Sequence, residues 1–526
     1  MMDSNECRRA VAAKWSNVDY RSLGTDNYDS SASSTDIEEN VRPIKRLKQE
    51  VIDLTSDDEN QEEDISSPFK LVKSDVYDSN VNSAHFITFK EIFGDKRLKK
   101  SILFSFQYEL DFLLEQFYSG VREIVIVAQK GTIRPCTTQK GISMVDRLSV
   151  IEFFMPQYTC HHSKMILNLY DDGSCKMFLP SNNFTYAEAN YPQQVCWCSP
   201  NLPPSRSGYT EGASEFHDDL IEYLKVYHNK EIVQKIVKDV KLLDFTPLKD
   251  VTFIFSAPTK DLTTGFQLLS QRLSDHRKPA ESKNSTNHYL CQTSTLGAAI
   301  SKKTHANLFT HVFIPILHGI TSLKSKLVDT ETLGGLYRAH NITPYIVYPT
   351  VEEIRTSPVG WLCSGWFHFN YNRDMAHYNM LAEELSVFYK QDPKFLSANR
   401  KATPSHSKFY MKSTISDDSN PFNNLDWCLY TSANLSLTAW GSGTARPRNY
   451  EAGVLYKSGR KPLVCKSFTN VVYKTSRQEI VSDNSQIVLV PFTLPVVKYE
   501  TAQDEAFCMA KDYNLLDIHG IPYQHH

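Results

Sequence analysis

Two distant segments of this chain carry a histidine, a lysine and an asparagine in the same order. They are His162, Lys164 and Asn182 in the first segment, and His406, Lys408 and Asn434 in the second. An imidazole can attack phosphorus or transfer a proton, while an ammonium and an amide can bind phosphate oxygens. A His-x-Lys pair alone carries little information. The repetition of the full set predicts the two halves of one phosphate-binding site.

Strand geometry explains why this spacing matters. Each His-x-Lys pair precedes an expected strand, and residues two apart on a strand point to the same side. Residues 165–170 and 175–179 are predicted to form a β-hairpin around an Asp-rich turn, and the second segment has a longer Asp/Asn-rich loop between its strands. Each hairpin returns its asparagine to the histidine. Two such segments that face each other could catalyse phosphoryl transfer without a metal ion or a cofactor.

The chain from residue 81 onwards alternates predicted strands and helices. Apolar patterns predict strands at 121–129, 148–155, 251–255 and 308–317, helices within 215–243, at 266–273 and at 381–389, and a polar loop at 277–287. This alternation predicts an α/β fold. We expect two similar halves, residues 81–245 and 246–526, each a mixed β-sheet flanked by helices and related by a pseudo-twofold axis.

Residues 1–80 have a different composition from the rest of the chain. They contain 18 acidic and 10 basic side chains with few bulky apolar residues, which predicts a disordered tail. Residues 45–48 (KRLK) form a basic cluster of the kind that nuclear import receptors bind, so we expect the protein in the nucleus. Residues 51–55 (VIDLT), which precede an acidic run, resemble a SUMO-interacting motif. Residues 47–50 (LKQE) resemble a SUMO acceptor site.

Composition excludes several classes of protein. With 41% hydrophobic and 12% aromatic residues, the 526-residue chain can build a large core. No apolar run approaches the roughly 18 to 20 residues that a membrane helix needs, and the first ten residues lack the apolar segment of a secretion signal. The 11 cysteines include no C-x-x-C pair, which favours free thiols over disulfides or a zinc site. We therefore expect an intracellular protein that does not bind membranes.

The repeated segments also resemble a known family. HHSKMILNLY, PSNN, HSKFYMK and TSANLSLTAWG, with the downstream Asn449-Tyr450-Glu451, are similar to the two motifs of the tyrosyl-DNA phosphodiesterase type 1 family of the phospholipase D superfamily. The resemblance spans residues 85–526. It implies a phospholipase D-like fold and hydrolysis of the bond between a DNA 3′ phosphate and a tyrosine. The family forms a covalent phosphohistidine and needs no cofactor or metal ion.

The resemblance assigns roles to individual residues. Phospholipase-type motifs carry an aspartate seven residues after the histidine, where this chain has Leu169 and Ser413. The DNA-processing branch uses a glutamine and a glutamate instead, and Gln194 and Glu451 match these roles. Which of the two pairs with which histidine stays open. The resemblance makes His162 the nucleophile and His406 the general acid and then the general base, and the lysines and asparagines would bind phosphate oxygens.

Three further residues match DNA-binding positions of the family. Tyr158 would stack on a base, and Thr295 and Ser436 would bind backbone phosphates. The implied partner is single-stranded DNA with a 3′-phosphotyrosyl or another blocked 3′ end, together with a peptide derived from topoisomerase I. SUMO or a SUMO-modified protein is a second expected partner. Because both half-sites occur in one chain, we expect a monomer.

Alternative functions remain at this point. Within the superfamily, the chain could be a phospholipase, a phosphatidyltransferase or a general nuclease, but the missing aspartates disfavour the lipid enzymes. A non-catalytic scaffold that binds DNA or SUMO is disfavoured because both His/Lys/Asn sets are complete. A metallohydrolase is disfavoured because no His-x-x-x-His or His-x-x-Glu pair lies in the repeated segments.

Overall fold

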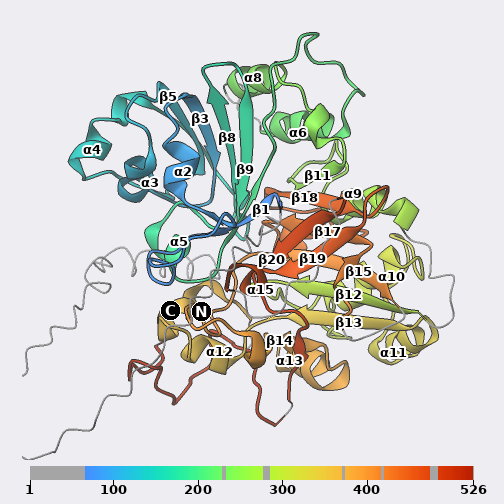
Figure 1. Ribbon diagram of the computed structural model, residues 1–526. Coiled ribbons are helices and arrows are strands. Elements are labelled where there is room, and N and C mark those ends of the chain that lie inside the picture. The colour runs from blue at the N-terminus through green and yellow to red at the C-terminus, as the bar shows by residue number, and fades with distance from the viewer. Residues whose placement is uncertain are drawn as a thin grey trace, which may run out of the picture.

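The computed structural model describes residues 66–227, 231, 233–276, 285–369, 374–415, 420–473, 484–500 and 502–524. Within these ranges the chain forms two eight-stranded mixed sheets flanked by helices. Figure 1 shows the first sheet in blue and green at the top and the second in yellow-green to red below it. The α/β class expected from the sequence is therefore confirmed.

The first sheet uses strands from the N-terminal part of the chain. In spatial order they are β2 (Phe86–Ile87), β1 (Phe69–Val72), β10 (Val195–Cys198), β9 (Cys175–Pro180), β8 (Met165–Tyr170), β3 (Leu98–Phe104), β5 (Glu123–Gln129) and β7 (Leu148–Phe153). The expected hairpin is present as the antiparallel pair β8–β9. Next to it, β3 pairs antiparallel with β8, and β3, β5 and β7 run parallel.

The second sheet uses strands from β11 onwards. In spatial order they are β11 (Val251–Ser256), β18 (Glu451–Lys457), β17 (Trp427–Thr431), β15 (Phe409–Ile415), β12 (Thr286–Gln292), β13 (Ile342–Val347), β14 (Phe388–Lys390) and β21 (Val497–Lys498). Its central hairpin is β15–β17, with β12 antiparallel to β15. Strands β12, β13 and β14 run parallel.

Seven strands of the first sheet are repeated in the second. The corresponding pairs are β1 and β11, β3 and β12, β5 and β13, β7 and β14, β8 and β15, β9 and β17, and β10 and β18. Each pair agrees in sequence order, in spatial order and in direction relative to its neighbours. The fold is thus duplicated, and the hairpin that follows each His-x-Lys pair has the same place in both sheets.

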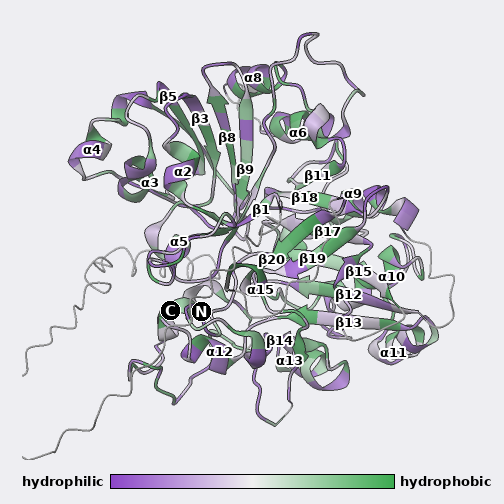
Figure 2. Ribbon diagram, in the orientation of Figure 1, coloured by the Kyte–Doolittle hydropathy of each residue, from purple (hydrophilic) through white to green (hydrophobic). Residues whose placement is uncertain are grey.

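The helices are short and lie around the sheets. The α-helices are α2 (Phe89–Phe93), α3 (Leu110–Gln116), α4 (Gln139–Ile142), α5 (Tyr186–Asn190), α6 (Glu215–Lys225), α8 (Lys238–Val240), α9 (Gly265–Arg272), α10 (Ile314–Leu317), α11 (Thr330–Ala339), α12 (Val351–Arg355), α13 (Met375–Asn379), α14 (Leu437–Trp440) and α15 (Phe468–Tyr473). Figure 2 shows hydrophobic colour along central strands such as β17 and hydrophilic colour on outer helices such as α4. None of the helices described is long and apolar enough to cross a membrane.

Single-turn and irregular elements complete the chain. The 3-10 helices are η1 (Val145–Arg147), η3 (Thr246–Leu248), η4 (Ser274–His276), η6 (Gly360–Trp366) and η9 (Pro393–Phe395), and the π-helices are η2 (Val233–Val237), η5 (Phe309–Phe313) and η8 (Met380–Glu384). Two small sheets contain β4 (Tyr108–Glu109) with β6 (Ile133–Arg134), and β16 (Asn424–Leu425) with β19 (Leu463–Ser467) and β20 (Gln486–Val490).

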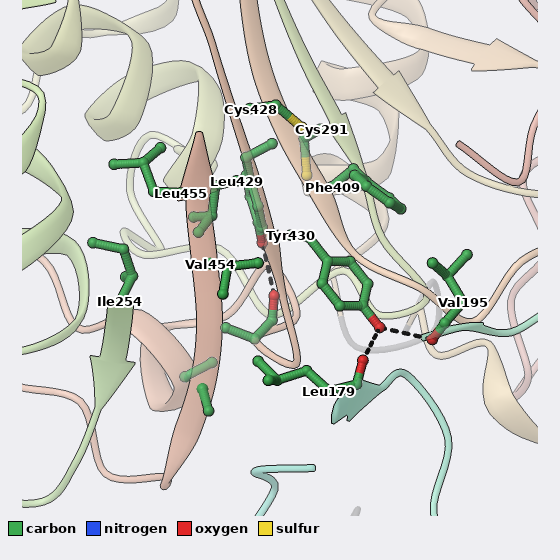
Figure 3. Close-up of a cluster of buried hydrophobic side chains, with 14 of the residues drawn as sticks. Leu179, Val195, Ile254, Cys291, Phe409, Cys428, Leu429, Tyr430, Val454 and Leu455 are labelled. Atoms are coloured by element: carbon green, nitrogen blue, oxygen red, sulfur yellow. Dashed lines mark hydrogen bonds between the residues drawn. The ribbon is translucent and has the colours of Figure 1, made fainter. Parts of the chain in front are cut away.

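One hydrophobic core spans both halves, and a second, smaller one lies within the first half. Tyr430 of β17 extends from the second sheet to the first, where its hydroxyl lies 2.9 Å from the carbonyl oxygen of Leu179 and 2.8 Å from that of Val195 (Figure 3). In the same region the indole N–H of Trp197 donates to the hydroxyl of Tyr456, 2.7 Å away. Because these contacts are buried, they fix how the two sheets face each other.

The beginning of the folded region differs from the expectation. Residues 66–80 are part of the fold and not of a disordered tail, because β1 pairs with β10 and with β2. Phe69 and Leu71 are fully buried, and the ring of Phe69 contacts Tyr430 in the second half. Strand β1 has only four residues and follows a long acidic segment, so the average composition of residues 1–80 does not reveal it. The basic cluster at 45–48 and the segments at 47–50 and 51–55 lie outside the described residues.

Three predictions of secondary structure are also wrong. Residues 308–317 form η5 and α10 instead of a strand, because a short apolar run that is buried on all sides has no periodicity to distinguish the two. The helix expected at 381–389 ends with η8, since Ser386 adopts a left-handed φ of 51° before β14 begins. The end of the loop expected at 277–287 belongs to β12, and residues 277–284 lie outside the described part.

Candidate active site

Both histidines lie at the junction of the two sheets. His162 precedes β8 by three residues and His406 precedes β15 by three residues. The backbone N–H of His162 donates to the carbonyl oxygen of Tyr450, which precedes β18, at 2.9 Å. In the other half, the backbone N–H of His406 donates to Gln193, just before β10, also at 2.9 Å. Each histidine is therefore attached to the opposite half of the molecule by an equivalent bridge.

The lysines supply positive charge inside this junction. Only 1% of Lys164 and none of Lys408 is exposed. Lys164 Nζ donates to the carbonyl oxygen of His162 at 2.9 Å, and Lys408 Nζ donates to that of His406 at 2.5 Å. Burial lowers the pKa of both histidines most, and the charges of Lys408 and Lys164 lower that of His162 and of His406 further. The lysine of each half therefore lies close enough to affect the histidine of the other half.

His162 has a carboxylate partner from the second half. Its Nδ1 lies 2.9 Å from Glu451 Oε2, which also accepts a hydrogen bond of 2.6 Å from the Ser432 hydroxyl. Burial lowers the pKa of His162 to about 4, and Lys164 lowers it as well, while Glu451 raises it. The ring is therefore neutral near pH 7. A proton on Nδ1, held by Glu451, leaves the lone pair on Nε2 available for attack.

His406 has two partners on its Nδ1. Glu188 Oε1 of α5 lies 3.3 Å away, and Gln194 Nε2 lies 3.5 Å away. The open question of pairing is thereby answered, since Glu451 contacts His162 and Gln194 is next to His406. Glu188 was not anticipated. It follows the α5 N-cap Thr185 by three residues, a spacing typical of a helix capping box. The sequence pattern therefore indicates a helix cap and gives no sign of a role in the site.

The second-half asparagine is oriented by its neighbours. The Oδ1 atom of Asn434 accepts hydrogen bonds from the hydroxyls of Thr293 and Ser294, at 3.1 and 3.0 Å. Because an amide oxygen and an amide nitrogen point in opposite directions, this arrangement aims the Nδ2 donor away from β12. An anionic oxygen in the junction is a suitable acceptor for that donor.

The equivalent residue in the first half is Asn183, not the expected Asn182. Asn183 and Asn434 each lie three residues after the end of the second hairpin strand, β9 or β17. The Oδ1 of Asn183 accepts from the Ser105 hydroxyl after β3, just as that of Asn434 accepts from Thr293 after the corresponding β12. The Nδ2 of Asn183 donates to Glu188 at 2.8 Å and keeps a second N–H.

Asn182 is fully buried and differs in its contacts. Its Nδ2 donates to the carbonyl oxygen of Asn183 at 2.6 Å, and its Oδ1 has no hydrogen-bond partner among the described residues. An exchange of the amide nitrogen and oxygen would place two acceptors together, so this orientation is fixed. The structure therefore places Asn183, and not the expected Asn182, in the position equivalent to Asn434. Ser181 is followed by two asparagines in the sequence, and the expectation selected the first of them.

The three expected DNA-binding residues lie near the two motifs. Tyr158 is 51% exposed and has a left-handed φ of 63°, which is strained for a residue with a side chain. Segments 295–297 and 434–436 lie side by side, because the Gly297 N–H donates to the Leu435 carbonyl oxygen at 2.8 Å. Thr295 Oγ1 has no hydrogen-bond partner among the described residues, and the Ser436 hydroxyl caps α14.

In the ranges that the structure covers, no three His, Cys, Asp or Glu side chains are grouped so that they could hold a metal ion. The charges that face the two histidines come from the two lysines and from the carboxylates of Glu188 and Glu451.

Duplicated mixed sheets whose junction holds paired histidines and lysines define the phospholipase D class of phosphodiesterases. Comparison with known proteins identifies the family within this class. A sequence model of the family described as tyrosyl-DNA phosphodiesterase matches residues 68–500 of this chain. The chain belongs to that family.

Individual relatives agree with this assignment. Tyrosyl-DNA phosphodiesterase 1 of Saccharomyces cerevisiae is 42% identical over 96% of this chain and 96% of its own length. A probable tyrosyl-DNA phosphodiesterase of Caenorhabditis elegans is 26% identical over 82% of this chain and 86% of its own length. The crystal structure of the yeast enzyme matches with a TM-score of 0.74 and 45% identity, over 84% of this chain and 99% of that chain. The chain is thus a phosphodiesterase with the fold of this family.

Proposed function

We propose that this chain hydrolyses the bond between a DNA 3′ phosphate and a tyrosine, as in a topoisomerase I adduct, through a covalent phosphohistidine. The observation that carries the proposal is the pair of buried histidines, each with a carboxylate on Nδ1 and each influenced by the lysine of the opposite half. Membership of the tyrosyl-DNA phosphodiesterase family supports the choice of substrate.

In the first step, Nε2 of His162 attacks phosphorus and the P–O bond to tyrosine breaks. His406, in its protonated form, donates a proton to the departing phenolate oxygen. The products are a phosphohistidine on His162, a neutral His406 and a free tyrosine or tyrosyl peptide. Since the pKa of tyrosine is near 10, it leaves far more readily than a sugar alkoxide. This difference favours the tyrosyl bond over an internucleotide bond.

In the second step, water replaces His162 on phosphorus. Neutral His406 removes a proton from the water, the new P–O bond forms, and the P–N bond to His162 breaks. The electron pair of that bond returns to the imidazole, so both histidines regain their starting states. The DNA leaves with a 3′ phosphate. Throughout both steps the charge on the phosphoryl oxygens is stabilised by Lys164, Lys408 and the two equivalent asparagines.

The bound DNA is proposed to be single-stranded. The exposed ring of Tyr158 offers a surface on which an unpaired base can stack, a contact of about 1 to 3 kcal/mol. The adjacent segments of Thr295 and Ser436 offer hydroxyl groups for backbone phosphates. Phosphate contacts carry no base information, so weak sequence preference and a strong dependence on salt are expected.

The function is tested with an oligonucleotide that ends in a 3′-phosphotyrosine, incubated with the protein in EDTA. The expected products are the 3′-phosphate oligonucleotide and tyrosine. Phosphatidylcholine and unmodified DNA serve as competing substrates under the same conditions. Cleavage of the lipid or of internal DNA bonds, with the tyrosyl ester left intact, would contradict the proposal and favour another phospholipase D-type enzyme or a nuclease.

The assignment of the asparagines makes a second test possible. Asn183→Ala is expected to lower kcat by about 10² to 10³, the usual loss of one donor to a transition-state oxygen. Asn434→Ala should cause a loss of similar size. Asn182→Ala is the matched control and should cost less than about tenfold, because its amide donates to the backbone. Rates are compared per folded protein, and a larger loss for Asn182→Ala than for Asn183→Ala would overturn the assignment.

For the chain outside the site, we propose a monomer that acts in the nucleus and binds SUMO or a SUMO-modified protein. Support comes from the presence of both half-sites in one chain, from the basic cluster at 45–48 and from the apolar segment at 51–55. Light scattering measures the mass, and microscopy of a variant with alanines at 45–48 measures nuclear import. A dimer, or undiminished import, would contradict these assignments.

A further inference from the structure

The orientation of the Gln194 amide determines what it can offer to His406. Its Nε2 donates to the backbone carbonyl oxygen of Glu188 at 2.8 Å, and its Oε1 accepts from the Ser181 hydroxyl at 2.5 Å. A carbonyl oxygen can only accept a hydrogen bond, so the amide cannot be turned round. Gln194 therefore presents an N–H group to Nδ1 of His406. A protonated Nδ1 finds no acceptor in that N–H group.

Glu188 provides the acceptor that Gln194 lacks. Its Oε1 lies 3.3 Å from His406 Nδ1, closer than the amide nitrogen of Gln194. The backbone N–H and the Nδ2 of Asn183 donate to its two oxygens, both at 2.8 Å, which fixes the carboxylate in place. Helix α5 brings it there through the cap that the Thr185 hydroxyl forms with the Glu188 N–H.

The structure assigns to Glu188 the role of a positioning residue that holds the Nδ1 proton of His406 and stabilises the imidazolium that protonates the leaving group. This assignment rests on the proposed function, because it concerns the same reaction. The expectation from the sequence was that Gln194 and Glu451 support the two histidines, so Glu188 takes the place expected for Gln194. The two histidines then have the same chemical support, Glu451 for His162 and Glu188 for His406, although the two carboxylates come from non-equivalent elements, β18 and α5.

The charges around His406 show why such a carboxylate is needed. Burial lowers the pKa of His406 to about 3, and Lys408 and Lys164 also lower it, while Glu188 raises it. Burial alone would raise the pKa of Glu188, but the hydrogen bond and charge of a protonated His406, together with Lys164, lower it. Glu188 is thus the ionised partner of a protonated His406. When the phosphate diester binds between the lysines, its negative charge offsets theirs and the carboxylate can hold His406 protonated.

The test is the pH dependence of the first-turnover rate at saturating substrate for Glu188→Gln, which removes the charge and keeps the shape, because this rate reports the groups of the enzyme–substrate complex. Loss of a neighbouring carboxylate destabilises the imidazolium, so the pKa of His406 falls. The basic limb of the profile, which reports protonated His406, is expected to move to lower pH by about 1 to 3 units. First-turnover release from the 3′-phosphotyrosyl oligonucleotide should fall by about 10² to 10⁴. Release from the corresponding 4-nitrophenyl ester, whose phenolate departs without protonation, should fall by less than about tenfold.

Gln194→Ala is the matched control, because Gln194 also lies next to Nδ1 of His406. Because it removes an N–H that opposes the imidazolium, the basic limb should stay in place or move to higher pH. A shift to lower pH in Gln194→Ala, or an unmoved limb in Glu188→Gln, would overturn the proposal. Equal losses on both substrates would do the same, since they indicate a merely structural role.

A second variant covers the case in which Glu188→Gln does not fold. Glu188→Asp keeps the charge, but its side chain is one methylene group shorter, so the carboxylate lies farther from His406. It should recover most of the activity and show a smaller shift of the basic limb in the same direction, and an unmoved limb would again overturn the proposal. If the wild-type protein itself fails to cleave the tyrosyl ester, the proposed function fails, whereas a failure of the Glu188 variants alone leaves that function intact.

Discussion

Replacement of His162 by alanine is expected to abolish turnover, with kcat reduced by about 10⁴-fold or more, because no other group can form the bond to phosphorus. The remaining junction still contains the lysines and His406, so substrate binding should change little. Single-turnover kinetics on the 3′-phosphotyrosyl oligonucleotide measure the loss, and a denaturing gel should show no covalent adduct between protein and DNA.

His305→Ala is a suitable control for this prediction. His305 is partly exposed and pairs with Asp374, away from the two motifs, at 3.0 Å. Its replacement should leave kcat and KM unchanged. If His162→Ala keeps more than about one hundredth of the wild-type rate, or if it forms an adduct, the nucleophile has been assigned wrongly.

The two motifs could be found from the sequence because residue type and spacing carry their chemistry directly. His and Lys two positions apart before a strand have to face the same side, wherever the strand lies. The hairpin that follows was visible from its Asp-rich turn. The contacts that join the halves were not visible, since the backbone bridges from His162 to Tyr450 and from His406 to Gln193 join residues far apart in the chain.

Errors in the site arose where the register of the fold decides between neighbours. Asn182 and Asn183 are neighbours in the sequence, and the Ser-x-Asn spacing of Ser432 and Asn434 recurs only with Asn183, a signal that the correspondence between β9 and β17 supports. Glu188 was missed for a different reason. A glutamate three residues after a threonine at a helix start has a sufficient local explanation, and nothing in the sequence places it next to His406.

The prediction of the fold failed where the local sequence pattern was ambiguous. Strands β3 and β12, which lie next to the central hairpins, were not anticipated, and β12 begins with the polar residues Thr286 and Asn287. The run at 308–317 is buried on every side, so its helical form depends on the shape of the surrounding core. The α/β architecture was nevertheless predicted, because the alternation of strands and helices, the repeated motif and the family resemblance do not depend on these elements.

His406→Ala is expected to trap the reaction half-way, with most of the protein attached to DNA. Without His406 the first step loses its general acid, but a tyrosine phenolate can still depart. The second step loses the base that activates water, and a neutral water molecule attacks phosphohistidine poorly. Both steps lose general catalysis, but water, with a pKa of about 15.7, depends on it more than a phenolate with a pKa near 10, so hydrolysis should become slower than formation of the adduct.

A denaturing gel with labelled DNA measures this adduct directly. The labelled band should shift to the mass of protein plus oligonucleotide, and it should persist long after tyrosine has been released. The double variant with alanine at both 162 and 406 is the control and should show no shifted band, because the adduct needs the imidazole of His162. Product release at the wild-type rate from His406→Ala, without any adduct, would refute a role for His406 as the base. An adduct in the double variant would instead place the covalent bond on another residue.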